Sequence, residues 1–407
     1  MTSERELILE SLMLINENGA FANVVEKDVL DKYDYLLPNQ KAFIKRVIDG
    51  TEENLLNIDR IINEHSKTKV DKQKPLIRNL LRMSVYQIVY MDKVPASAVV
   101  NEAVKLAKKR GFKTLSGFVN GVLRTVARLK KDEKISPDDK KIPEWIHEHL
   151  LSNYGEEKTK AIEADVFKTH PVSVRIRSGK ADEKYFTKNP LMEGAYTVNK
   201  GYSIKDIPGY DEGAFIVQDV SSMSVCVMAG IKPTDVVIDV CASPGGKSIH
   251  AADMAKEVYS FDLTEKKVEK IIENAKRCRV DNITAAVQDA TIKNEELTGK
   301  ADVLIADLPC SGLGVMGKKS DIMHKTKKED LAELVKIQKK IIDNIWDYVK
   351  VGGLLMYSTC TLNPDENENR VSYIVENYPF VKEDEKTFIP GIDHTDGFYV
   401  ARLRRKA

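Results

Sequence analysis

The segment from Val236 to Lys247 constrains the fold of this chain more than any other stretch. Its first three residues are β-branched and predict a buried strand, and residues 241–247 then read Cys-Ala-Ser-Pro-Gly-Gly-Lys. The proline and the glycines predict a sharp turn before Ser248 opens a helix. Glycines let a ligand approach the backbone, and a helix N-terminus offers unpaired N–H groups to acceptor atoms. We therefore expect a ligand site at this turn.

The pattern of glycines limits which ligand can bind there. The turn is not G-x-G-x-x-G, and no G-x-x-x-x-G-K-[ST] can be drawn through it. A smaller nucleoside ligand is therefore favoured over a nicotinamide dinucleotide or a triphosphate.

From residue 214 onward predicted strands and helices alternate, which indicates an α/β doubly wound parallel sheet. Ligands of such sheets bind at the carboxyl ends of the strands, where four aspartates stand: Asp239, Asp262, Asp289 and Asp307. The Asp262 carboxylate could accept hydrogen bonds from a ribose diol or could cap the N-terminus of the following helix. The Asp289 carboxylate could accept from an adenine amino group or could likewise cap the next helix. The set fits S-adenosylmethionine better than NAD, because no second glycine-rich phosphate loop follows.

Two cysteines stand close to the ends of neighbouring predicted strands. Cys310 follows Pro309 in Asp-Leu-Pro-Cys, and Cys360 lies in Tyr-Ser-Thr-Cys-Thr. A thiolate can add to C6 of a cytosine, which makes C5 nucleophilic enough to take a methyl group from a sulfonium. Loss of the C5 proton then lets the thiolate leave, a step that a second acid–base group assists. The alternative for a free cysteine is a purely structural role as a small, buried apolar side chain. This interpretation applies to Cys226 and Cys278, which lie on predicted helices.

Composition excludes several classes of protein. The net charge is only +1, so any nucleic-acid surface must be local. The five cysteines form no C-x-x-C, which argues against a disulfide framework and against a metal site. No signal peptide is evident, and no apolar run is long enough to span a membrane. We expect a cytoplasmic monomer with free thiols.

The first 130 residues predict an all-α bundle, because apolar residues recur at spacings of three and four. Basic residues gather in two places on its last helices, at 105–113 and at 124–131. If the two helices pack as neighbours, these basic residues would form a patch that binds RNA phosphates. The simpler interpretation is that the charges mark a helix face exposed to solvent.

The same helices resemble a known domain. Val94–Lys108 and Gly117–Arg124 are similar to the NusB-type RNA-binding domain, which is fused to 16S ribosomal RNA cytosine-5 methyltransferases of the RsmB type. The resemblance implies that Asn101, Glu102 and Asn120 set the packing of the helices.

Between the bundle and the sheet, the sequence predicts a charged linker at 131–142 and a region of mixed character at 143–212. The alternation in residues 172–177 predicts a half-buried strand with Arg175 and Arg177 on one face. By the resemblance this region is a small α/β extension that binds RNA, with the two arginines on phosphates. Arginines on a wet sheet face are the alternative.

Three motifs complete the resemblance. Asp239–Lys247, Asp307–Gly314 and Ser358–Glu368 are similar to the cofactor loop, the Pro-Cys motif and the Thr-Cys motif of RNA cytosine-5 methyltransferases. The implied fold of residues 213–407 is a class I Rossmann-like methyltransferase domain. The implied contacts of S-adenosylmethionine are Cys241, Ala242, Ser243, Pro244, Gly245, Gly246, Lys247, Asp262, Asp289 and Asp307.

The resemblance also implies catalytic roles. Cys360 would be the nucleophile, and Cys310 would help to break the covalent adduct. Asp307 would hydrogen-bond the cytosine ring while Lys247 orients its carboxylate. The presence of both thiols separates this chain from DNA cytosine-5 methyltransferases, whose nucleophile is the Pro-Cys thiol. The loop at 317–322 departs from the family pattern by lacking a proline.

These features leave three hypotheses about function. The leading one is methyl transfer to C5 of a specific cytosine in 16S ribosomal RNA. The second is a non-enzymatic RNA-binding or antitermination factor, which would use only the helical bundle. The third, methylation of a protein amide nitrogen, would need Asn-Pro-Pro-Tyr where Asp-Leu-Pro-Cys stands.

Overall fold

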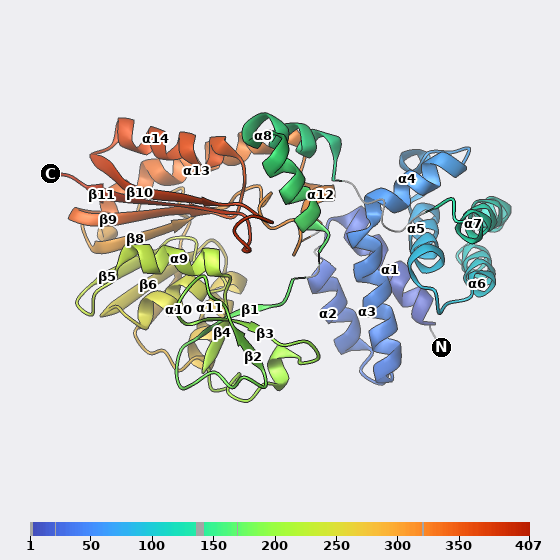
Figure 1. Cartoon of the computed structure of the whole chain (residues 1–407), viewed down its shortest axis with the longest axis horizontal. Coiled ribbons are helices and arrows are strands. Elements are labelled where there is room, and N and C mark those ends of the chain that lie inside the picture. Colours follow the sequence, from blue (N-terminus) through green and yellow to red (C-terminus); the bar gives the residue numbers. More distant parts are fainter. Residues whose placement is uncertain (1–2, 21, 136–141, 169, 320) are drawn as a thin grey trace. The chain divides into compact units, whose positions relative to one another are not determined.

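The computed structural model describes residues 3–20, 22–135, 142–168, 170–319 and 321–407 (Figure 1). The chain divides into two compact units. The first ends at Ile146 and also takes in Met323–Lys325, whereas the second comprises His147–Ile322 and Thr326–Ala407. The middle of the predicted linker at residues 131–142 lies outside the described residues.

The first unit is a helical bundle. Its helices are α1 (Glu4–Asn18), α2 (Ala22–Lys32), α3 (Pro38–Glu53), α4 (Leu55–His65), α5 (Pro75–Tyr90), α6 (Ala96–Lys109) and α7 (Ser116–Lys131), with short 3₁₀ turns η1 (Val70–Lys72) and η2 (Lys113–Leu115). Prolines occupy the first turns of α3 and α5, where no backbone N–H is needed. Helix α5 packs against α1, α3, α4, α6 and α7, so its apolar side chains form the centre of the core.

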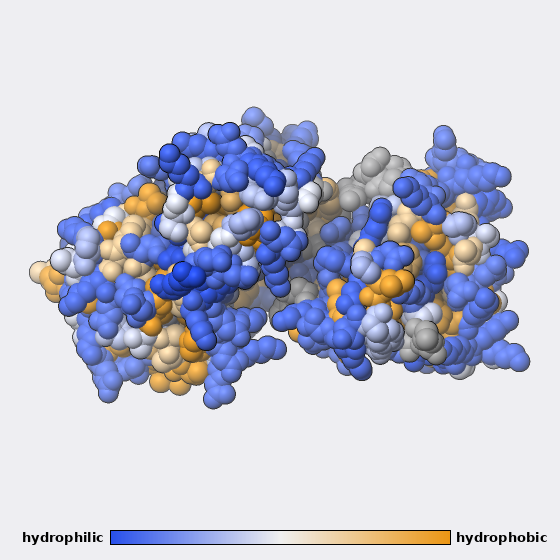
Figure 2. All heavy atoms as spheres, turned by 90° about the horizontal axis from the view of Figure 1, so that it is seen from below, coloured by the Kyte–Doolittle hydropathy of each residue, from blue (hydrophilic) through white to orange (hydrophobic). Residues whose placement is uncertain are grey.

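The basic residues of the bundle lie on neighbouring helices, because α6 packs against α7. Two of them are neutralised by α1: Lys109 Nζ lies 2.7 Å from Glu6 Oε2, and Arg110 pairs with Glu6 and Glu10. The other exposed basic residues are Lys105, which pairs with Glu102, and Lys108, Lys113, Arg124, Arg128 and Lys131. Hydrophilic residues cover most of the face shown in Figure 2, with apolar residues in small groups.

The second unit contains a seven-stranded sheet in the order β10-β11-β9-β8-β5-β6-β7. Its strands are β5 (Val236–Asp239), β6 (Glu257–Asp262), β7 (Ile283–Val287), β8 (Ala301–Asp307), β9 (Val349–Thr359), β10 (Phe380–Phe388) and β11 (Phe398–Arg405). The strands from β5 to β9 are parallel, and β10 and β11 are antiparallel additions. Strand β10 is not predicted from the sequence. The charged residues at its centre, 382–386, are typical of a strand at the edge of a sheet.

Helices cover both faces of this sheet (Figure 1). The helices are α9 (Val220–Ala229), α10 (Gly246–Ala252), α11 (Glu265–Arg277), α13 (Lys328–Ile345) and α14 (Glu368–Asn377), with 3₁₀ turns η4 (Glu295–Leu297), η5 (Trp346–Tyr348) and η6 (Pro364–Glu366). The short helix α12 (Ile322–Lys325) lies between β8 and α13 in the sequence, and its last three residues belong to the first unit. Apolar residues of α13 and α14 pack on one face, and those of α9 and α10 pack on the other. The parallel register brings Asp239 beside Ile305 and Asp307 beside Ser358, so the strand-end residues share one edge.

A second, four-stranded antiparallel sheet has the order β2-β3-β1-β4. Its strands are β1 (Ser173–Ile176), β2 (Phe186–Lys188), β3 (Ala195–Val198) and β4 (Phe215–Val217), and the 3₁₀ turn η3 (Ile204–Asp206) lies between β3 and β4. The sheet reaches Val217, past the predicted boundary at residue 212. The helix before it, α8 (Glu144–Val166), is divided into two segments at Gly155, which has φ 74°.

The small sheet shows that Arg175 and Arg177 are not free to bind RNA. Both pair with Asp253: Arg175 Nη2 lies 2.7 Å from Oδ2, and Arg177 Nη2 lies 2.5 Å from Oδ1. Their side chains are only 9% and 11% exposed. They share a sheet face with Ile216, which packs on Ile249. The expectation of phosphate contacts is therefore wrong, because this face packs against the large sheet's helical layer.

Candidate active site

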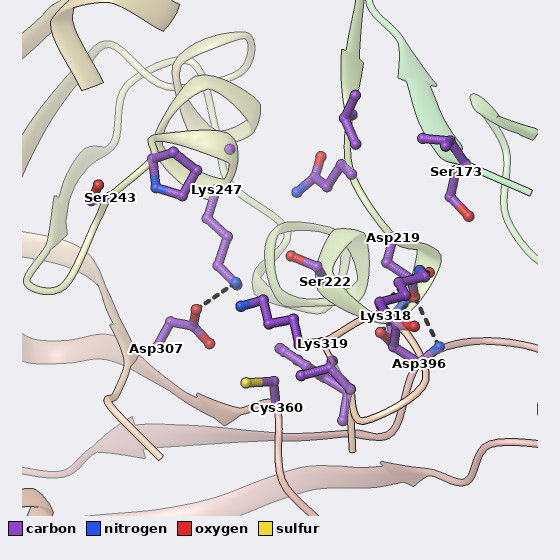
Figure 3. Close-up of a pocket in the computed structure, with 18 of the residues that line it drawn as sticks. Ser173, Asp219, Ser222, Ser243, Lys247, Asp307, Lys318, Lys319, Cys360 and Asp396 are labelled. Carbon is purple, nitrogen blue, oxygen red and sulfur yellow. Dashed lines mark hydrogen bonds and ion pairs between the residues drawn. The ribbon is translucent and has the colours of Figure 1, made fainter. Parts of the chain in front are cut away.

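A cavity of about 460 Å³ opens at the carboxyl ends of the parallel strands (Figure 3). This volume is in the range of small-molecule sites. One side, which we name the inner wall, consists of residues at the strand ends and at the start of β11: Asp239, Cys241–Pro244, Gly246, Lys247, Asp307, Cys360 and Phe398. The opposite side, the outer wall, consists of residues at the ends of β1 and β4, at the start of α9 and in loops: His170–Ser173, Val217–Asp219, Ser221, Ser222, Val315, Lys318, Lys319 and Asp396.

The turn after β5 is held by short hydrogen bonds. Gly245 has φ +102°, a conformation that glycine adopts easily, and its N–H donates to the carbonyl of Ala242 at 2.7 Å. The N–H of Ser243 donates to Asp262 Oδ2 at 2.9 Å. Asp262 also accepts from Lys267 Nζ at 2.8 Å. Asp262 thus fixes the shape of the turn from the neighbouring strand.

Asp239 carries a carboxyl oxygen that is open to a ligand. Its Oδ2 accepts from Ser248 Oγ at 2.7 Å, whereas Oδ1 has no hydrogen-bond partner in the described part of the chain. Burial raises the pKa of Asp239 to about 7. The sequence analysis places Asp239 among the strand-end acids without giving it a role. An unpartnered buried oxygen in the cavity wall indicates that it faces a donor when a ligand is bound.

The sulfur atoms of Cys310 and Cys360 lie 3.2 Å apart. Both are free thiols of intermediate burial. The hydrogen bond from Cys310 lowers the pKa of Cys360, and the nearby Lys319 and Lys247 act in the same direction. The same hydrogen bond, together with burial, raises the pKa of Cys310. With these two shifts Cys360 is the thiol that ionises first, and its thiolate then accepts from the Cys310 thiol.

Lys247 and Asp307 form an ion pair beside the thiols, with Nζ 2.6 Å from Oδ2 (Figure 3). Ser358 Oγ donates to the other oxygen of Asp307 at 2.7 Å. Burial opposes the charge on Lys247, but the Asp307 carboxylate outweighs it and raises the pKa of Lys247. The ammonium also lies 5.3 Å from the centroid of the Phe398 ring. Both charges of the pair are therefore retained in a largely buried site.

The outer wall is held by an ion-pair cluster. Lys318 Nζ lies 2.9 Å from Asp219 Oδ2 and 2.8 Å from Asp396 Oδ2. Burial and the neighbouring Asp219 raise the pKa of Asp396 to about 6. Gln218 contributes an amide whose Oε1 accepts from Arg175 at 3.2 Å, and its Nε2 has no partner among the described residues.

Several residues of the cavity are absent from the sequence-based assignment. Gln218 and Phe398 lie in segments with no chemical motif, and only their positions beside predicted strand ends could have indicated them. Conversely, Gly245, Asp262, Asp289 and Cys310 do not line the cavity. Asp289 Oδ1 accepts from the N–H of Thr291 at 2.8 Å in a turn, and the 3₁₀ turn η4 that follows is capped by Asn294, so Asp289 does not cap a helix.

The parallel sheet, the strand-end turn and the preceding helical bundle together define a Rossmann-like methyltransferase domain joined to a NusB-like domain. The family described as "16S rRNA methyltransferase RsmB/F" matches residues 227–404, and the NusB family matches residues 2–128. The chain is 32% identical to a probable ribosomal RNA small subunit methyltransferase B of Bacillus subtilis, over 100% of this chain and 99% of that protein. It therefore belongs to the ribosomal RNA small subunit methyltransferase B family.

Other relatives agree with this assignment. A probable methyltransferase B of Synechocystis is 29% identical, with both chains covered completely. The crystal structure of a protein designated PH0851 superimposes with a TM-score of 0.82 at 21% identity, over 99% of this chain and 98% of that one, which shows the shared fold. The comparisons give no support to the alternative of a non-enzymatic factor.

As a member of this methyltransferase family, the protein uses S-adenosylmethionine as its methyl donor. The inner wall fits this molecule on two observations. The free Oδ1 of Asp239 suits a donor group, and a Cβ placed on Gly246 would meet no atom within 4 Å, so the space beside the turn is open. In the described ranges no helix is long and apolar enough to cross a membrane, and no side-chain cluster has a metal-binding arrangement.

Proposed function

We propose that this protein methylates C5 of a cytosine in 16S ribosomal RNA through a covalent bond between Cys360 Sγ and C6. The observation that carries the proposal is the pair of sulfur atoms 3.2 Å apart at the edge of the cavity that Lys247 and Asp307 line. The substrate class comes from the relatives, which are named as small-subunit ribosomal RNA methyltransferases.

The cofactor-binding residues of the proposal are those of the turn Cys241–Lys247 together with Asp239. S-adenosylmethionine supplies a methyl group on a sulfonium when it is bound there. Asp262 acts on this site by shaping the turn, through its bond to the N–H of Ser243. Asp262 and Asp289 contribute direct contacts only if the ligand extends beyond the cavity.

In the covalent step, the Cys360 thiolate forms a bond to C6 and the electron pair of the C5–C6 double bond moves toward C5 and the ring carbonyl. Lys247 uses one of its donors on Asp307, so its remaining donors are available to the ring oxygen or nitrogen that gains this charge. Asp307 holds the ammonium in place and can accept a hydrogen bond from the base. These two residues thereby orient the cytosine above the sulfur.

Release of the product reverses the first bond. Loss of the C5 proton restores the double bond and breaks the S–C6 bond, and the electron pair returns to Cys360. The Cys310 thiol, 3.2 Å away, donates to the departing sulfur and stabilises it as a thiolate. The raised pKa of Cys310 beside the lowered pKa of Cys360 supports this role, because Cys310 keeps its proton when Cys360 has lost its own.

The exposed basic residues on α6 and α7 support RNA binding by the helical bundle, since phosphate contacts by Lys and Arg supply sequence-independent affinity. The five free thiols support action in the reducing cytoplasm.

The test is methyl transfer from labelled S-adenosylmethionine to 16S ribosomal RNA prepared from cells that lack the protein. Cys360→Ala should abolish transfer, and bisulfite sequencing should locate a single cytosine methylated by the wild type. Cys310→Ala should accumulate a protein–RNA complex that survives denaturation. Cys278→Ala, a buried thiol away from the cavity, is the matched control and should remain active. Full activity of Cys360→Ala would refute the proposal.

A further inference from the structure

A fully buried carboxylate lies directly behind the two thiols. Glu366 has 0% relative exposure, and each of its oxygens accepts two hydrogen bonds. Oε1 accepts from Ser311 Oγ at 2.6 Å and from Asn363 Nδ2 at 3.0 Å. Oε2 accepts from the N–H of Ser311 at 2.9 Å and from Gln338 Nε2 at 2.9 Å. The arrangement has four donors and no acceptor facing the carboxyl group.

This surrounding indicates that Glu366 is ionised. A protonated carboxyl group would direct its own hydrogen at one of these donors, whereas a carboxylate is an acceptor at every position. Among the described residues none forms a salt bridge with Glu366, so only neutral dipoles compensate the charge. Burial of a charge without a cation is costly, and a neutral side chain of similar shape would avoid that cost.

The donors come from the two loops that carry the thiols. Ser311 follows Cys310, and Asn363 lies three residues after Cys360. The loops also touch directly, because the hydroxyl oxygens of Ser311 and Thr361 lie 2.6 Å apart. Since Ser311 gives its proton to Glu366, Thr361 is the donor in that bond. A continuous chain of hydrogen bonds therefore joins one loop to the other through Glu366.

The third element in the network is helix α13. Gln338 donates both to Glu366 Oε2 and to the carbonyl of Pro309, each at 2.9 Å. Pro309 immediately precedes Cys310, so the backbone on both sides of that thiol is fixed relative to the carboxylate. The strand end before Cys360 is fixed separately by the pairing of β8 with β9. Removal of the carboxylate is thus expected to move Cys310 more than Cys360.

We propose that Glu366 is a positioning residue that holds the Cys310 sulfur within hydrogen-bond reach of Cys360. The roles of the two thiols rest on the proposed function, but the distance between them does not. Without the carboxylate the loop after Asp307 loses the bonds that Glu366 makes to Ser311, although it keeps the Ser311–Thr361 contact and the bond from the Gly314 N–H to the Cys360 carbonyl. Cys360 would still attack the base, while release assisted by Cys310 would become slow.

The first experiment measures the spacing of the thiols without RNA or methyl donor. Phenylarsine oxide condenses with two adjacent thiols, forming two As–S bonds and one water with no change in oxidation state. The wild type should retain one arsenical, detected by mass spectrometry, against a competing dithiol, and Cys310→Ala should lose it. Glu366→Gln, which preserves shape but places donors against donors, should release the arsenical at an approximately tenfold lower concentration of competitor, from the loss of about one charge-assisted hydrogen bond.

The second experiment measures turnover. We expect Glu366→Gln to lower kcat for methyl transfer by about 10²-fold with little change in the KM for RNA, because a displacement of about 1 Å at a reacting group has effects of this size. The covalent protein–RNA complex should accumulate, as in Cys310→Ala. Asp365→Asn is the matched control, since the adjacent Asp365 is exposed and its carboxylate accepts from Asn369 Nδ2, outside the network around Glu366.

The outcomes separate this proposal from the proposed function. Wild-type arsenical retention and wild-type kcat in Glu366→Gln would overturn the role of Glu366 even if Cys360 is the nucleophile. Weakened arsenical binding in a protein that methylates no cytosine would leave the positioning role intact and refute the methylation chemistry. If Glu366→Gln does not fold, Ser311→Ala removes a single donor and should show the same two changes at smaller size; unchanged thiol spacing there would also overturn the proposal.

Discussion

The two walls of the cavity are built in different ways. Inner-wall residues leave the ends of adjacent parallel strands, so the register of the sheet places Asp239, Asp307 and Cys360 beside one another. The outer wall comes from segments that are distant in sequence, and it is held by the ion pairs of Lys318 with Asp219 and Asp396. Backbone pairing therefore determines where the chemistry occurs, whereas side-chain charges determine the shape of the space around it.

This comparison predicts that changes in the inner wall affect turnover, and that changes behind the outer wall affect stability first. The largest effect is expected for Lys247→Met. It removes the cation beside Asp307 and the donors that face the base, so kcat should fall by about 10²–10³-fold, as for other preorganised donors. The measurement is methyl transfer at saturating RNA and S-adenosylmethionine.

The control for Lys247→Met is Lys350→Met, which breaks the partly exposed pair with Asp302 at the start of the same strands. An exposed pair contributes about 0–1 kcal/mol to stability, and this one is distant from the cavity residues. Equal activity losses in both variants would show that Lys247 acts through folding alone.

An intermediate effect, on stability, is expected for Arg175→Met. Arg175 is nearly buried and shares Asp253 with Arg177, so its loss should lower the free energy of unfolding by about 3 kcal/mol. Because Arg175 contacts no solvent-facing anion site, the slope of RNA affinity against salt concentration should not change.

The matched change in the helical bundle is Lys108→Met, at an exposed basic residue of α6. If the basic patch binds phosphates, the salt slope should decrease by about one while stability stays within about 0.5 kcal/mol of the wild type. A reduced salt slope in Arg175→Met would restore the phosphate-contact interpretation of the small sheet.

The smallest effect is expected for Lys319→Met. Lys319 lines the outer wall, and its charge contributes to the lowered pKa of Cys360, after the larger effect of the Cys310 hydrogen bond. Removal of this cation should raise the pKa of the thiol and reduce its thiolate fraction at neutral pH. The rate of Cys360 alkylation by iodoacetamide should then rise at higher pH than in the wild type. An unchanged profile would exclude a role of the outer wall in activating the nucleophile.

The sequence predicts the inner wall well because strand-end motifs are local. The Pro-Gly-Gly turn, Asp-Leu-Pro-Cys and Ser-Thr-Cys each combine a buried strand with residues that are difficult to explain by packing alone. Their meeting at one edge follows from parallel topology, which the alternation of strands and helices indicates. The same topology accounts for the short distance between the sulfur atoms of Cys310 and Cys360, although only Cys360 lines the cavity.

The outer wall cannot be predicted in this way, because its contacts join residues that are distant in the sequence. Nothing near Lys318 in the sequence indicates that Asp219 and Asp396 will face it. Likewise, the alternation around Arg175 predicts a sheet face correctly but does not say whether water or Asp253 covers it. The edge strand β10 is not predicted for a related reason. Its charged centre has the sequence character of a solvent-exposed loop, and only its pairing with β11 makes it a strand.

Strands β8 and β9 run side by side in the same direction, and one sulfur stands shortly after the end of each. On the proposed function, the sheet thereby carries two thiols toward the same carbon of the base. The strand ends that carry them are alike, so the surroundings of each sulfur in its loop set which thiol attacks and which assists release. An exchange of roles between Cys310 and Cys360 would require no rearrangement of strands, so this topology leaves the assignment of roles to a few loop side chains.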